Sequence, residues 1–96
     1  MENYVMITSE NEHQVKQDLS QYKLDNILDS FFKATKQNFK VELNYEIKEN
    51  ENSIKVISLE WLDGEWLDGK WYNGVWHDGI WYYGIWHNGI WKHGIS

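Results

Sequence analysis

The stretch that decides the fold is WHDGIWYYGIWHNGIWKHGIS, residues 76–96, in which a Trp recurs every five residues and a Gly follows each Trp by three. The pattern starts at Trp61 and fills seven units: EWLDG, EWLDG, KWYNG, VWHDG, IWYYG, IWHNG and IWKHG. Five is not the helical period, and because it is odd, a straight strand would turn successive Trp side chains to opposite faces. Asp or Asn precedes Gly in five of the seven units, which is a strong turn signal. The sequence therefore predicts a turn in every unit that keeps all Trp side chains on one side.

Two architectures satisfy this pattern. In the first, each unit forms one side of a short right-handed quadrilateral β-solenoid, with the Trp and the Gly two positions before it pointing inward. The large indole would then need a neighbour without a side chain, which explains the Gly. In the second, each unit is a very short strand followed by a two-residue turn. Because directly opposed residues of antiparallel strands share a face, this meander would place every Trp on one sheet face, which the helices would have to cover.

The spacing Gly-x-Trp-x-x resembles the pentapeptide-repeat family, whose fold is a right-handed quadrilateral β-helix with one small and one large apolar residue inside. The resemblance covers about 61–96, and Trp and Gly stand where that family usually has Leu or Phe and Ala. The fragments GEW and DGKWYNG are similar to parts of MORN repeats, and GKWYNG to choline-binding repeats, although both families have longer units. Tandem Trp-x-x-Gly-x runs are also similar to stretches of uncharacterised tailed-phage proteins. The resemblance to pentapeptide repeats implies a β-helical repeat, and none of these resemblances fixes a function.

The composition divides the chain into two regions. All seven Trp and all seven Gly lie in 61–96, and the preceding residues contain neither. Such a change marks two structural regimes. We therefore expect an N-terminal α/β unit over 1–59 and the seven repeats over 60–96.

The N-terminal unit has the pattern of ordinary α/β structure. Residues 3–8 predict a strand. The apolar spacing that follows is helical but changes phase, which predicts two helices, 10–20 and 24–37, rather than one. Residues 39–48 alternate between apolar and polar, and their return strand changes phase near Val56–Ile57, which predicts a hairpin with a β-bulge. The expected fold is α+β, a β-α-α-β-β unit that runs into the repeats.

Composition also limits the class of protein. The chain of 96 residues suits one domain or two very small ones, and its formal net charge of −6 is the wrong sign for binding a phosphate backbone. It has no Cys, so disulfides and thiolate metal sites are excluded. No apolar run approaches the roughly 20 residues of a membrane span, and the N-terminus lacks a signal-peptide pattern. We expect a cytoplasmic protein, in the host cell if it is phage-borne, with neither nucleic acid nor membrane as a direct partner.

No residue pattern predicts chemistry. His77 and His87 occupy equivalent positions of units ten residues apart, which is unfavourable for a shared metal site, and the Asp residues are explained by the turns. No Ser–His–Asp spacing, phosphate-cradling loop or catalytic carboxylate pair is present. The sequence predicts a protein that is not an enzyme and has no catalytic residues, cofactor or metal.

Two sets of residues are candidate partner-binding positions. An inward Trp turns the residue before it outward, and this position becomes apolar toward the C-terminus. Four carboxylates, on the polar face of the first hairpin strand and at the junction with the repeats, are not explained by turns. The candidates are Ile80, Ile85, Ile90, Ile95, Glu42, Glu46, Glu60 and Glu65. We expect the C-terminal Ile residues and the uncapped repeat edge to mediate homo-oligomer formation or docking of the protein partner.

Three functions of different classes remain. The leading one is a protein-binding module, such as a phage- or mobile-element-borne acidic inhibitor that occupies a basic surface of a host nucleic-acid-binding protein. The second is a structural component of a virion or larger assembly, in which copies stack through the repeat end. The third is binding of a glycan or a choline-type ligand by exposed Trp and Tyr side chains.

Overall fold

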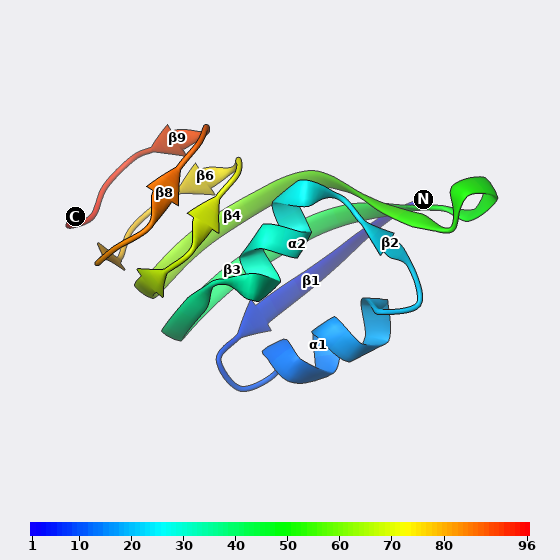
Figure 1. Ribbon diagram of the computed structural model, residues 1–96, viewed down its shortest axis with the longest axis horizontal. Coiled ribbons are helices and arrows are strands. Elements are labelled where there is room, and N and C mark those ends of the chain that lie inside the picture. Colours follow the sequence, from blue (N-terminus) through cyan, green and yellow to red (C-terminus); the bar gives the residue numbers. More distant parts are fainter.

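The computed structural model describes all 96 residues and shows a mixed α+β fold, in which two short helices pack on a sheet that continues into the Trp repeats (Figure 1). The first part of the chain contains β1 (Glu2–Thr8), α1 (Glu12–Leu19), β2 (Lys23–Leu24), α2 (Asn26–Lys33), β3 (Thr35–Lys48), a 3₁₀ turn (Glu49–Glu51) and β4 (Ser53–Asp68). The repeats add five two-residue strands: β5 (Lys70–Trp71), β6 (Val75–Trp76), β7 (Ile80–Trp81), β8 (Ile85–Trp86) and β9 (Ile90–Trp91). Apart from the short β2, the predicted order of helices and strands before the repeats is confirmed.

The predicted break between the helices is confirmed, but the second helix is shorter than the sequence predicts. The Asp25 carboxylate begins α2 by accepting hydrogen bonds from two N–H groups of its first turn. The helix ends at Lys33, and residues 35–37, predicted as helical, form the start of β3. Backbone pairing with β4 prevails there over helical spacing. The Lys36 amine also donates to the carbonyls of Phe31 and Ala34, at 2.7 and 2.8 Å, and so satisfies the end of α2.

Seven strands form one large sheet in the order β1-β3-β4-β6-β9, with β2 and β7 paired to other parts of β4, and β5 and β8 form a separate two-stranded sheet. Pairing is antiparallel from β1 to β4. Asn44 lies opposite Ser58 while Tyr45 lies opposite Val56, which leaves Ile57 between them without a partner. The predicted bulge near Val56–Ile57 is therefore confirmed, and it lets each phase of β4 direct its apolar residues to the helices.

The repeats pair in parallel, and each unit pairs with the unit three further along. The registers join Trp61 to Trp76, Trp66 to Trp81, Trp71 to Trp86 and Trp76 to Trp91, a spacing of fifteen residues. We call three successive units a layer. The period of five is confirmed, whereas the number of four sides is wrong, because four units per layer would pair residues twenty apart. The antiparallel meander is also wrong, since the strands within the repeats run parallel.

Indole packing explains why three units make a layer. Trp61, Trp66 and Trp71 contact one another edge to face, with ring centroids 5.6 to 6.4 Å apart, and so fill the space that they enclose. Each ring also stacks on the ring of the next layer; Trp61 and Trp76 lie 4.6 Å apart and 6° from parallel. A fourth side would leave space at the centre of the layer. The buried indole N–H groups of Trp61, Trp66, Trp71 and Trp76 have no hydrogen-bond acceptor.

Glycine is required where the chain turns between sides. The repeat glycines have φ angles from +122° to +132°, a range that L side chains rarely adopt. A Cβ atom on Gly79 would lie 2.5 Å from the carbonyl oxygen of Gly64 and 2.9 Å from Nε1 of Trp61. The expected reason for Gly, room for the indole together with backbone freedom, matches this geometry.

The N-terminal unit covers the first layer of the repeats. β3 pairs with the edge of β4 that faces away from β6 and β7, and the Phe39 ring stacks on Trp61 at 5.5 Å. β4 itself crosses the expected boundary at residue 59. One core cluster of 16 buried residues contains side chains from both helices, the hairpin and four Trp of the repeats. The repeats therefore have one covered end, at β3, and one end without such cover.

Candidate protein-binding surfaces

One face of the large sheet carries no helix. The strand registers place Met6, Glu42, Glu60, Val75 and Ile90 in a single row across β1, β3, β4, β6 and β9. All five side chains are at least partly exposed, whereas neighbours such as Ile7, Val41 and Trp61 point to the opposite face and are buried. We call this row the face row. It brings together three of the predicted binding residues, Glu42, Glu60 and Ile90.

The centre of the face row is acidic. Glu42 and Glu60 are directly opposite each other on adjacent strands, an arrangement that is unfavourable for like charges. Nε2 of His77 lies 2.8 Å from a carboxylate oxygen of Glu60, while no ion pair engages Glu42. Apolar side chains flank the two carboxylates on both sides. This arrangement suits a surface that carries a positive charge beside apolar groups.

The other two predicted carboxylates have partners of their own. Glu46 contacts the Lys48 amine at 3.0 Å, and this hydrogen bond lowers the pKa of the Glu46 carboxyl. Glu65 accepts hydrogen bonds from the side chains of Asn38 and Tyr82, and the bond from Asn38 is the main reason that its pKa is lowered. Glu65 also lies on a different side of the repeats from Glu60, opposite Ile80. The structure therefore separates it from the face row.

The four Ile residues point outward but lie on three different sides. Ile80 and Ile95 share one side, Ile85 lies on a second opposite Lys70, and Ile90 lies on a third opposite Val75. Ile80 is half-buried, and the other three are exposed by 51 to 67%. They therefore do not form one continuous apolar row along the repeats. What they share is their position near the C-terminal end.

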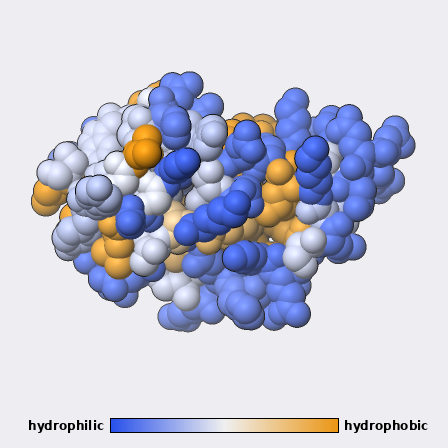
Figure 2. All heavy atoms as spheres, in the orientation of Figure 1, coloured by the Kyte–Doolittle hydropathy of each residue, from blue (hydrophilic) through white to orange (hydrophobic).

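That end is the most apolar exposed region of the molecule. Six of the eleven exposed large hydrophobic side chains belong to 82–96: Tyr82, Tyr83, Ile85, Ile90, Trp91 and Ile95. We call residues 82–96, the last layer that the structure describes, the open end. In Figure 2, pale and orange spheres gather at the left end of the molecule, where β8 and β9 lie in Figure 1. The exposed fraction of the Trp side chains rises in the same direction, from 0% at Trp76 to 37% at Trp91.

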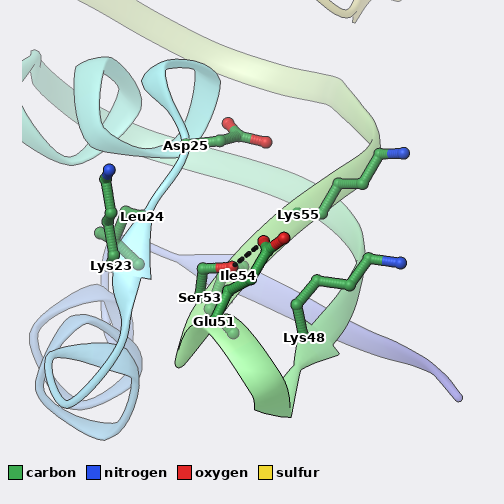
Figure 3. A pocket seen from close by; sticks show the side chains of 8 residues that line it. All are labelled: Lys23, Leu24, Asp25, Lys48, Glu51, Ser53, Ile54 and Lys55. Atoms are coloured by element: carbon green, nitrogen blue, oxygen red, sulfur yellow. Dashed lines mark hydrogen bonds between the residues drawn. The ribbon is translucent and has the colours of Figure 1, made fainter.

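A cleft of 580 Å³ lies between β2 and the tip of the β3–β4 hairpin. Figure 3 shows that the Lys48 and Lys55 amines point out of it on one side and the Lys23 amine on the other. The Glu51 carboxylate accepts a hydrogen bond from the Ser53 hydroxyl, and Asp25 is occupied with the start of α2 and with the Val56 N–H. Its polar groups do not converge on a point where a reacting atom would sit.

The remaining candidates of the sequence are dispersed. His77 contacts Glu60, whereas His87 stacks on Tyr72 at 4.6 Å on another side. No group of three or more His, Cys, Asp or Glu side chains is placed to hold a metal ion. Neither helix is long and apolar enough to cross a membrane. A search of protein-family models, curated proteins and solved structures finds no match to the chain.

Two features of these surfaces were not predicted from the sequence. Met6 and Val75 join the face row only through pairing of strands distant in the chain, and no local pattern marks them. Pairing of Glu42 with Glu60 likewise depends on the bulge at Ile57, which sets the register on either side. The alternation of residues 39–48 gave the correct face for Glu42 but carried no information about its neighbour.

Proposed function

We propose that the protein is a non-enzymatic protein-binding module that uses the face row to bind a basic surface of its partner. The observation that carries the proposal is the pair Glu42 and Glu60, two carboxylates held side by side on a sheet face that no helix covers. Directly opposed like charges cost stability, and sequences tend to break such local rules at functional sites. A host protein that binds nucleic acid offers a surface of the required sign.

Apolar neighbours make this face more than an acidic patch. Met6 is exposed by 39% and Ile90 by 57%, so a partner would bury apolar area on both sides of the carboxylates. Charge would then govern the rate of association and apolar contact the lifetime of the complex. An inhibitor that occupies a nucleic-acid-binding face fits this division.

Affinity capture from the natural host tests the proposal when three forms are compared. Wild type is run beside Glu42→Lys with Glu60→Lys, and beside Glu10→Lys with Glu49→Lys, which changes net charge equally at exposed positions outside the face row. We expect a partner retained by wild type and the control but lost by the face variant. Its association with wild type should slow as salt rises, because exposed charges are screened beyond about 8 Å at physiological ionic strength. Equal capture by all three forms, without salt dependence, would refute the charge-based mechanism.

A second function is favoured by the open end. Apolar side chains gathered at an uncovered end of a repeat suit a component of a virion or larger assembly that contacts another subunit there. Ligand binding by aromatic residues has less support, because four of the seven Trp rings are buried. The exposed aromatic side chains left for a glycan or choline-type ligand are Tyr4, Tyr72, Tyr82, Tyr83 and Trp91.

We also infer that the repeats are a short three-sided β-solenoid. The parallel register of fifteen residues and the inward Trp side chains support this form. The kinship with pentapeptide repeats is then one of period and inward packing, with a different number of sides. The right-handed sense of the winding stays a prediction.

A further inference from the structure

Backbone groups at the open end lack the partners that earlier layers have. The Trp61 carbonyl accepts a hydrogen bond from the His77 N–H at 2.8 Å, and the Trp76 carbonyl accepts one from Lys92 at the same distance. In each case the donor is sixteen residues later. No residue of the 96 stands in that position for the carbonyls of Trp86 and Trp91.

The same holds for the N–H groups that point along the repeat. The Trp81 N–H donates to the Ile95 carbonyl at 2.7 Å, fourteen residues later. No residue serves Trp86 or Trp91 in this way. At this register both the N–H and the carbonyl of Trp91 point out of the open end, as do those of Trp86. A residue with both groups free on one edge is prepared for an antiparallel hydrogen-bonded pair.

Side chains at the open end suit a dry contact. The Trp91 ring stacks on Trp76 at 4.9 Å, and its other face has no ring above it. Residues 82–96 contain no Asp or Glu, although the whole chain has a net charge of −6. Charge repulsion is therefore weaker at this end than elsewhere on the molecule.

The two ends of the repeats differ, and this limits what can bind. At the first layer β3 already pairs with β4, and Phe39 already stacks on Trp61. The open end of one copy therefore cannot continue onto the first layer of another. A contact between copies must join two open ends, and it stops at two molecules.

We propose that the open end binds the open end of a second copy, head to head about a two-fold axis. The axis makes the facing strands antiparallel, so that β9 pairs with its equivalent and Trp91 exchanges two hydrogen bonds with Trp91 of the partner subunit. Ile90 then lies opposite Lys92 of the partner subunit, whose alkyl stem covers the apolar side chain. This surface shares Ile90 with the face row but contains neither Glu42 nor Glu60, so the charge variants that test the proposed function leave the dimer contact in place.

Analytical ultracentrifugation of the whole protein tests the proposal. Between about 1 μM and 1 mM we expect the mass to rise from 11.6 kDa to twice that value and no further, since small interfaces give weak complexes. Added salt should favour the dimer, because it screens repulsion between two acidic chains. A constant mass of one chain over this range would overturn the proposal, and growth beyond two chains would overturn the capped-end argument.

Two variants locate the contact. Trp91→Lys places a charge at the centre of the open end and should weaken dimerisation at least tenfold. Tyr4→Lys makes the same aromatic-to-lysine change at a residue that is 65% exposed on β1, and should leave the dimer unchanged. Equal dissociation constants for the two variants would place the contact elsewhere.

Hydrogen exchange of wild type gives a readout that does not depend on the folding of a variant. The Trp91 amide should exchange rapidly in dilute protein and more slowly as concentration rises. The Trp81 amide, which is bonded to Ile95, should be protected at every concentration. An exchange rate of Trp91 that is independent of concentration, in protein of doubled mass, would exclude this dimer.

Discussion

Replacement of Gly79 by Ala tests the central packing of the repeats. The residue has a φ of +122°, and an added Cβ atom would lie 2.5 Å from the carbonyl oxygen of Gly64, a backbone atom that cannot move aside as a flexible side chain could. A side chain in this region of φ costs about 1–3 kcal/mol. Overpacking a closely filled interior adds about 1–3 kcal/mol. We expect Gly79→Ala to lower the free energy of unfolding by about 2–6 kcal/mol, a large part of the roughly 5–14 kcal/mol expected for a domain of this size.

Gly94→Ala is the matched comparison. Its Cβ atom would also lie 2.5 Å from a glycine carbonyl, that of Gly79, and its φ is +132°. No layer lies above Gly94, so the last turn can move outward and relieve the collision at smaller cost. Urea unfolding followed by circular dichroism should rank wild type first, Gly94→Ala next and Gly79→Ala last, with the exposed change His87→Ser close to wild type. Equal midpoints for Gly79→Ala and His87→Ser would refute the packing of glycine against the layer below.

Two further predictions concern the N-terminal unit. Burial lowers the pKa of the Lys36 amine, and its ion pair with Glu12 offsets this only in part. The unfolded chain, with a lysine pKa of about 10.4, therefore binds the proton more tightly, so stability should rise with pH between the lowered pKa and about 10.4. Lys36→Met should remove this rise in urea titrations, whereas the partly buried Tyr45, whose pKa is raised by desolvation, should make stability fall above about pH 10 in both proteins. Asp25→Ala should cost about 2–4 kcal/mol in the same assay, because it removes a helix cap and leaves the Val56 N–H, bonded at 2.7 Å, without its acceptor. A loss below 1 kcal/mol would show that water replaces the carboxylate.

Local sequence signals predicted most of the helices, strands and turns, because each of these has a characteristic spacing of apolar or turn residues along the chain. Alternation over residues 39–48, the phase change at Ile57 and the turn in every unit of the repeats all appear in the structure. The number of sides was not a local property. It depends on how indole rings fill the space inside a layer, and the five-residue period is the same for three sides as for four. The end of α2 was mispredicted for a related reason, since pairing of Lys36 with Trp66 across the sheet outweighs the helical spacing of its neighbours.

In the candidate binding surfaces, too, the local pattern predicts some properties of the residues and not others. Outward exposure of Ile85, Ile90 and Ile95 follows from the inward Trp and was predictable. The sequence did not predict which of these Ile residues lie together, because the side on which a residue falls depends on the number of units per layer. With three units per layer, Ile90 pairs with Val75, which pairs with Glu60, and all three lie in the face row. With four units per layer, residues twenty apart would pair instead, and Ile90 would not lie in the same row as Glu60. Grouping of the binding residues is therefore a consequence of core packing.

Buried and exposed charges in this chain are treated differently, and the contrast bears on function. The Lys36 side chain is 1% exposed, yet two carbonyls, the Glu12 carboxylate and the face of the Phe31 ring surround it. These contacts offset part of the cost of burying that charge. Glu42 on the face row has no ion pair, whereas Glu46 on the same strand is paired with the Lys48 amine. The contrast between Lys36, which has contacts on several sides, and the accessible Glu42, which has no ion pair, supports the proposal that a basic partner binds beside Glu42 and Glu60.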